Sequence, residues 1–230
     1  MYKNIKVIAF DADDTLWVNE TYFREAEHKF AKLLGKYETE NKIDQELFKI
    51  EIENLNLYGY GIKGFVLSMI ECALELSNYQ INPKTIQAIV DIGKEMLEKP
   101  IELLSGVEEV LQSLQSKFKL IVATKGDLLD QERKLEKSNL LKYFHHIEVM
   151  SDKKDKDYKK LIQHLDIQPS EFLMVGNSLK SDVLPPIKIG ASAIHIPFHT
   201  TWAHEEVSEK DSLNTTYKTL LNIKDVLTLF

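Results

Sequence analysis

A short apolar segment, residues 6–10, ends abruptly in the acidic cluster Asp11-Ala12-Asp13-Asp14. The segment does not alternate between polar and apolar residues, which is typical of a β-strand buried on both faces of a parallel sheet. Two carboxylates at positions i and i+2 repel each other unless a cation neutralises them or one of them is protonated. The beginning of the chain therefore predicts a parallel sheet whose first strand ends in an acidic cluster that needs a cation or a proton beside it.

Residues 19–99 have a different character. Apolar residues such as Phe23, Phe30 and Met69 recur at helical spacing. Asn82-Pro83 is typical of a helix cap followed by a first-turn proline. Because this stretch contains no strand-like segment, we expect an all-helical domain of residues 18–99. It would be inserted into an α/β core of residues 1–17 and 100–230.

From residue 100 onward, strand-like and helical segments alternate. This order predicts parallel βαβ units with right-handed crossovers, and hence a Rossmann-like α/β fold. In such sheets, ligands bind at the carboxyl ends of the strands. Polar residues stand at these ends, so we expect them to converge. The predicted strands are 119–123, 146–150, 172–175 and 191–196, and the predicted helices are 107–114, 127–137, 158–165 and 181–189.

Composition excludes several classes of protein. The 230 residues are 43% hydrophobic and 28% charged, as in an ordinary globular protein, and the formal net charge is −7. Without a basic stripe, binding to nucleic acid or to an anionic membrane is not expected.

The chain has one cysteine, Cys72, in an apolar helical pattern, and this residue is interpreted as a buried structural thiol. Residues 1–10 do not resemble a signal peptide, so we expect a cytoplasmic protein. The sequence does not indicate an oligomeric state.

The acidic cluster suits Mg²⁺, a hard cation that prefers oxygen ligands and needs few of them from the protein. A helix cap with solvated neighbours is the plainer alternative. A calcium loop also spaces its acids by two residues, but Leu16 stands where such a loop needs glycine. The cluster alone does not decide between these interpretations.

Three further motifs follow in order. Thr124 ends an apolar strand, a lysine-rich segment Lys153-Lys154-Asp155-Lys156 follows the next one, and the last is Gly176-Asn177-Ser178-Leu179-Lys180-Ser181-Asp182. Together with Asp11-x-Asp13-x-Thr15, they resemble the four motifs of the haloacid dehalogenase-like (HAD) hydrolase superfamily. The resemblance covers the whole chain, with residues 19–99 in the position of the helical cap that marks the type C1 phosphatase branch.

This resemblance implies a magnesium-dependent phosphohydrolase that acts on a small phosphomonoester. Asp11 would attack phosphorus and form an aspartyl-phosphate, and Asp13 would protonate the leaving group and then activate water. Thr124 and the motif lysine would hold the phosphoryl oxygens. Mg²⁺ would bind the Asp11 carboxylate, the Asp13 backbone carbonyl and Asp182. An acid at position 13 also separates this chain from the dehalogenase branch of the family.

Two motifs depart from the family pattern or leave a choice open. The fourth motif usually begins Gly-Asp, but here Asn177 stands in place of the acid, and it could reach a metal-bound water through its carbonyl oxygen. In the third motif, Lys153, Lys154 and Lys156 compete. The spacing to Tyr158 in the following helix favours Lys153.

Four further residues are candidates for substrate binding. Gly126 allows backbone amides to approach a phosphate, and Lys125 beside it could add charge or point to water. In the glycine-rich segment of residues 58–65, Tyr60 and Lys63 could contact substrate, although a tight turn between helices with packed tyrosines is an equal alternative.

Other functions remain as alternatives. A signalling receiver domain is disfavoured by the large insertion after Asp11. A catalytically silent phosphate-binding relative is kept open by Asn177, and a phosphomutase by the shared core motifs. His195, His199 and His204 lack a carboxylate or cysteine at zinc-ligand spacing, and His145-His146 is interpreted as a strand edge.

Overall fold

The computed structural model describes residues 2–208 and 216–230. The chain divides into two compact units. The first contains the chain up to Glu20, Ile101–Lys125, and the chain from Gln131 onward, and the second contains Thr21–Pro100 and Gly126–Asp130. The division of the chain into a core and a cap domain of residues 18–99 stays a prediction.

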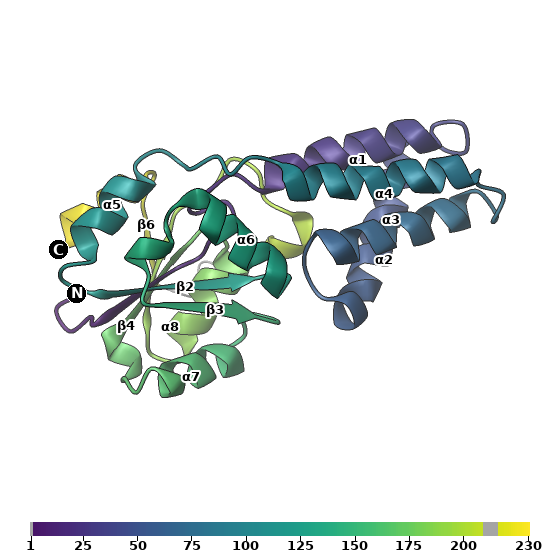
Figure 1. Ribbon diagram of the computed structural model, residues 1–230. Coiled ribbons are helices and arrows are strands. Elements are labelled where there is room, and N and C mark those ends of the chain that lie inside the picture. Colours follow the sequence, from purple (N-terminus) through teal and green to yellow (C-terminus); the bar gives the residue numbers. More distant parts are fainter. Residues whose placement is uncertain (1, 209–215) are drawn as a thin grey trace. The chain divides into compact units, whose positions relative to one another are not determined.

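The first unit is built on a six-stranded sheet in the order β3-β2-β1-β4-β5-β6, in which every neighbouring pair is parallel (Figure 1). The predicted α/β class with a parallel Rossmann-like sheet is confirmed. The strands are β1 (Val7–Phe10), β2 (Lys119–Lys125), β3 (His146–Met150), β4 (Phe172–Gly176), β5 (Ser192–His195) and β6 (Lys218–Thr219).

Helices cover both faces of this sheet. Successive residues of a strand point to opposite faces, so each strand packs against helices on both sides. Ile8 and Phe10 pack with apolar residues of α5 and α6, whereas Val7 and Ala9 pack with those of α7. The two faces thus have separate apolar clusters with the buried strands between them. The helices are α5 (Val107–Leu114), α6 (Leu128–Ser138), α7 (Asp155–His164) and α8 (Leu184–Lys188).

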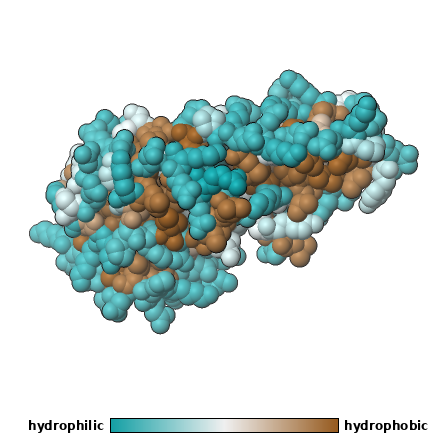
Figure 2. All heavy atoms as spheres, viewed as in Figure 1, coloured by the Kyte–Doolittle hydropathy of each residue, from teal (hydrophilic) through white to brown (hydrophobic). Residues whose placement is uncertain are grey.

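The second unit is helical and has its own core. Phe30, Leu47 and Met69 are buried in a cluster separate from the two sheet clusters, and Cys72 lies in the same core. Asn82 caps the last helix by accepting a 2.8 Å hydrogen bond from the Lys84 backbone N–H, as its sequence predicts. On the drawn face, hydrophobic residues show between hydrophilic ones (Figure 2). The helices are α1 (Glu20–Leu34), α2 (Glu40–Tyr58), α3 (Ile62–Leu76) and α4 (Pro83–Glu98).

The structure differs from the sequence prediction near the fourth motif and at the chain end. Instead of one helix over residues 181–189, a π-helix at Leu179–Val183 leads into α8. Pro185 and Pro186 lie in the first turn of α8, where a missing N–H costs nothing. Strand β6 and the 3₁₀ segment Ile223–Leu229 were not predicted. None of the helices in the described ranges has the length and apolar character needed to cross a bilayer.

Candidate active site

Strand register brings the motif residues of the first unit together. Phe10, the last residue of β1, is aligned with Val122 of β2 on one side and Val175 of β4 on the other. Asp11 and Thr124 therefore lie at the same edge of the sheet, at the carboxyl ends of the strands. Lys153 follows β3 and Asp182 follows β4, and their side chains meet Asp11 there.

Lys153 joins the two carboxylates of this cluster. Its Nζ lies 2.5 Å from Asp11 Oδ1 and 2.7 Å from Asp182 Oδ1, and all three side chains are buried. Lys154, by contrast, has a side chain that is 69% exposed and pairs with Asp152. Geometry therefore selects Lys153 as the lysine of the cluster.

The charges of this cluster depend on one another. Burial raises the pKa of Asp11 most strongly, and Asp182 and Asp13 raise it further, while Lys153 lowers it; the net result is a pKa of about 7. For Lys153, burial lowers the pKa, but Asp11 and Asp182 outweigh that effect and raise it above its usual value. Positive charge beside the two buried acids therefore favours their ionised forms.

Thr15 and Asn177 border the second oxygen of Asp11. The Thr15 hydroxyl donates to Asp11 Oδ2 at 3.1 Å. With its amide nitrogen turned toward the cluster, Asn177 donates to Asp11 Oδ2 at 3.3 Å and to the Asp13 carbonyl at 3.2 Å. Asn177 thus stands beside the acids, as the fourth motif predicts.

Asp13 is held by three side-chain donors. Trp17 Nε1 donates to Oδ1 at 2.8 Å, and Gln131 Nε2 donates to Oδ2 at 2.7 Å. Lys134 Nζ lies 2.9 Å from Oδ1 in a largely buried ion pair. Gln131 and Lys134 were missed in the sequence; their only signal is their spacing of three residues on the helix that follows Thr124.

Asp182 is fixed by the turn that carries it. The Ser178 N–H donates to Asp182 Oδ2 at 3.0 Å, and the Asp182 N–H donates back to the Ser178 carbonyl at 2.8 Å. A Cβ on Gly176 would lie 2.3 Å from Asp182 Oδ2. The glycine of the fourth motif therefore provides the space that the Asp182 carboxylate fills.

A further carboxylate, the partly buried Glu205, completes a polar network beside this turn. It accepts from Lys125 Nζ at 2.5 Å, from the Ser178 hydroxyl at 2.5 Å and from the Ser181 hydroxyl at 2.6 Å. Burial would raise the pKa of Glu205, but the charge of Lys125 and these hydrogen bonds outweigh it and lower the pKa to about 2. Sequence analysis missed Glu205, because it comes from a non-motif segment after β5.

The remaining candidates divide between the two units. Thr124 is buried at the end of β2, and its hydroxyl donates to the Lys125 carbonyl at 3.2 Å. Gly126 has φ 131°, a conformation that favours glycine. In the helical unit, Lys63 pairs with Asp127 at 2.8 Å, and Tyr60 lies beside Gly61 in the turn before α3. Substrate contacts by these residues stay predictions.

Asp14 serves the backbone rather than the acid cluster. Its carboxylate accepts from the Asn19 N–H at 2.8 Å and from the Glu20 N–H at 3.0 Å, where α1 begins. Its own backbone is left-handed, with φ 62°, which aspartate tolerates better than most residues. Burial is the main reason why the pKa of Asp14 is raised to about 8.

Comparison with known proteins identifies the family. The sequence model of haloacid dehalogenase-like hydrolases matches residues 5–190. The chain belongs to this family. The predicted family and the predicted hydrolase class of this HAD chain are thereby confirmed.

Three relatives illustrate the range of similarity. A haloacid dehalogenase-like family hydrolase from Xanthomonas campestris is 38% identical, over 91% of this chain and 88% of that one, with a TM-score of 0.82. N-acylneuraminate-9-phosphatase of Rattus norvegicus is 26% identical, over 82% of this chain and 81% of its own. Glyceraldehyde 3-phosphate phosphatase of Pyrococcus abyssi is 27% identical, over 83% and 80%.

Proposed function

We propose that this HAD hydrolase is a Mg²⁺-dependent phosphatase that acts on a small phosphomonoester through a phosphorylated Asp11. The observation that carries the proposal is the position of Lys153, whose ammonium lies between the buried Asp11 and Asp182 carboxylates. Phosphoryl transfer needs a nucleophile and positive charge at one point, and this arrangement supplies both.

The residues of the cluster fit a magnesium ion. Asp11 and Asp182 offer carboxylate oxygens within reach of one cation, since one ammonium already contacts both. Burial raises the pKa of Asp11 more than Lys153 lowers it, so a second cation beside Asp11 would further favour its ionised form. The Asp13 carbonyl would be a third ligand. The Asn177 amide, which donates to Asp11 here, would turn over so that its oxygen accepts from a metal-bound water. Bound Mg²⁺ would supply charge neutralisation of the phosphoryl oxygens.

The chain's own residues account for the other requirements. Asp11 attacks phosphorus and the alcohol oxygen leaves with a proton from Asp13, giving the acyl phosphate. Asp13 then takes a proton from the water that attacks phosphorus, and inorganic phosphate leaves with Asp11 restored. Trp17, Gln131 and Lys134 fix the Asp13 carboxylate for both steps. Lys153 and Thr124 would hold the equatorial oxygens.

A small phosphorylated metabolite is the proposed substrate class. Two of the named relatives are phosphatases of small phosphorylated compounds, as their names state. Residues 18–99 would act as the helical cap of the C1 branch, with closure excluding water during transfer. The expected cytoplasmic location belongs to the same proposal.

Phosphate release from a panel of small phosphomonoesters tests this function. The assay compares Mg²⁺ with EDTA, and the wild type with Asp11→Asn. We expect Mg²⁺-dependent release by the wild type and none by the variant.

Asn177 favours one rival function, that of a silent phosphate-binding relative. Magnesium binding without release from any substrate would support that rival, and transfer of the phosphoryl group to a sugar acceptor would indicate a mutase.

A further inference from the structure

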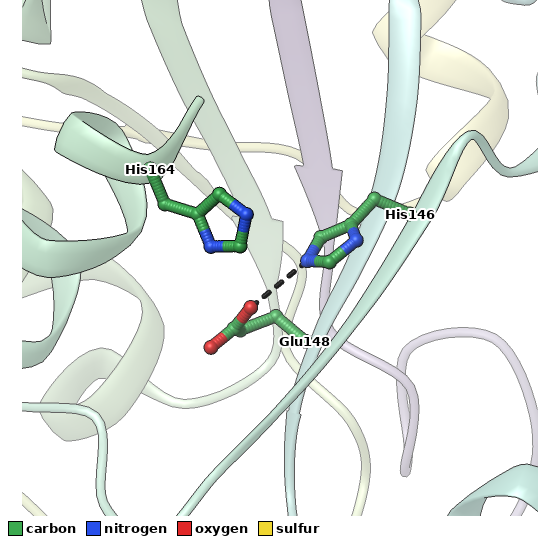
Figure 3. Close-up of side chains that lie close together, drawn as sticks. All are labelled: His146, Glu148 and His164. Carbon is green, nitrogen blue, oxygen red and sulfur yellow. Dashed lines mark hydrogen bonds and ion pairs between the residues drawn. The ribbon is translucent and has the colours of Figure 1, made fainter. Parts of the chain in front are cut away.

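A second group of metal-ligating side chains lies away from the acid cluster. His146, Glu148 and His164 point toward one another, and one ligand atom from each lies within 4.8 Å of the others (Figure 3). The His146 Nε2 and Glu148 Oε2 atoms are already 2.9 Å apart. Among the described residues, these three form the group of histidine, cysteine or acidic side chains whose ligand atoms lie close enough together to share one ion.

Strand geometry explains why the first two side chains stand together. His146 and Glu148 are two residues apart on β3, so they share one face of that strand. Ile147 between them packs against the cluster on the α5 and α6 side. The histidine and the glutamate therefore face the other side of the sheet, which α7 covers.

The third side chain comes from that helix. His164 is the last residue of α7, and its ring centroid lies 5.4 Å from that of His146. The buried residues Tyr158, Leu161 and Ile162 hold α7 against the sheet. Two well-packed elements thus set the spacing of the group, while the exposed His164 side chain can rotate to close it.

We propose that His146, Glu148 and His164 form a binding site for a transition-metal ion of the zinc type. Two imidazole nitrogens and one carboxylate oxygen are ligands that Zn²⁺ accepts, with water completing the shell. Imidazole is a poor ligand for Mg²⁺ or Ca²⁺, which prefer oxygen. Zn–N bonds of about 2.0–2.1 Å require the three atoms to draw closer together than they stand, and side-chain rotation provides this movement.

The site is separate from the acid cluster. His146 begins β3, whereas Lys153 follows its carboxyl end. A bound ion would fasten the C-terminal end of α7 to β3, which is the outermost strand on its side of the described sheet. The ion would therefore stabilise the folded chain and would take no part in phosphoryl transfer.

Zinc titration tests this site directly. The protein is stripped with EDTA, desalted and titrated with Zn²⁺ by calorimetry in excess Mg²⁺, which would fill the site proposed at the acid cluster. The variants are His164→Ala and Glu148→Gln. His145→Ala is the matched control, because His145 is exposed and adjacent to the site but outside it. Thermal unfolding with and without Zn²⁺ is recorded for each protein.

The proposal predicts one Zn²⁺ bound through this site. Affinity should fall at least tenfold in His164→Ala and Glu148→Gln and stay unchanged in His145→Ala. The rise in Tm caused by Zn²⁺ should be lost in the same two variants. Zinc binding by His164→Ala with the affinity of the wild type would overturn the proposal, as would a wild type that binds no zinc. Neither result depends on phosphatase activity.

Discussion

Lys153 separates two buried carboxylates, and this position makes it the most informative residue of the site. Removing one partner of a buried ion pair typically costs about 3–5 kcal/mol. We predict that Lys153→Met lowers Tm strongly in EDTA and less in Mg²⁺, because the metal replaces the missing charge. The variant should also lower kcat/KM by about 100- to 1,000-fold.

Lys154→Met is the matched control for this substitution, since its exposed side chain pairs with Asp152 outside the acid cluster. It should change Tm and kcat/KM little, because exposed ion pairs contribute about 0–1 kcal/mol. Equal losses in the two variants would show that Lys153 has no special place in the site.

Lys134 acts on the reaction through Asp13. Its ammonium and the Gln131 amide hold the two Asp13 oxygens. We predict that Lys134→Ala lowers kcat by about 10- to 100-fold, because the acid-base group loses its orientation, while KM changes little. Lys137→Ala, on an exposed part of the same helix, should retain the wild-type rate. Steady-state kinetics at one pH would measure both, and an unchanged kcat in Lys134→Ala would contradict this role.

The sequence predicts which residues gather at the site better than it predicts which residues support them. Asp11 and Asp182 follow strands and Thr124 lies at the end of one, and parallel strands bring their carboxyl ends to one edge. Lys134 and Glu205 give no such signal. Their positions depend on the rotation of α6 and on the path of the chain after β5, neither of which follows from local periodicity.

At the scale of elements, the π-helix at Leu179–Val183 positions Asp182. The Asp182 carboxylate fills the space beside Gly176, where a Cβ would lie 2.3 Å away. We predict that Gly176→Ala displaces this carboxylate, weakens Mg²⁺ binding at least tenfold and destabilises the fold by about 1–3 kcal/mol. Calorimetric Mg²⁺ titration and urea unfolding would measure these effects.

Gly35→Ala is the control for that change, because a Cβ there would meet only atoms at 3.7 Å. It should leave Mg²⁺ affinity unchanged. Wild-type Mg²⁺ affinity in Gly176→Ala would show that the Asp182 carboxylate does not need this space.

The segment that carries Glu205 is held by an ion pair with Lys125 of β2 and by a hydrogen bond from the Ser181 hydroxyl of the π-helix. The pKa of Glu205 is lowered from 4.5 to about 2, so its stabilising effect is complete above pH 4.5 and is lost as the pH falls toward about 2. We predict that Glu205→Gln is less stable than the wild type by about 2–3 kcal/mol at neutral pH. Urea unfolding at several pH values should show this difference shrinking toward zero near pH 2. A difference independent of pH would contradict the assignment.

The element order was largely predictable, and its exceptions have physical causes. Apolar segments bounded by polar residues located β1 to β5, because buried strands need such composition. Strand β6 has two exposed residues and thus no apolar signal. The π-helix and α8 look like one helix in sequence, since a single wide turn changes the apolar spacing too little to be detected.

At the scale of the whole molecule, two units with separate cores make up the chain. The acid cluster belongs entirely to the sheet-based unit, which supplies the proposed nucleophile, acid-base group and metal ligands. The family match extends through both units, from residue 5 to residue 190. The proposed function therefore depends on whether a phosphoryl group becomes bonded to the Asp11 carboxylate of the first unit.

Chemical trapping of the phosphorylated enzyme tests that claim most directly. The enzyme is quenched in acid during turnover of a substrate found in the phosphomonoester panel, then reduced with borohydride, which converts an acyl phosphate of aspartate to homoserine. Peptide mass spectrometry then locates the modified position. We predict homoserine at position 11, only when Mg²⁺ and substrate are present. Phosphate release with an unmodified Asp11, or with homoserine at another aspartate, would contradict the account.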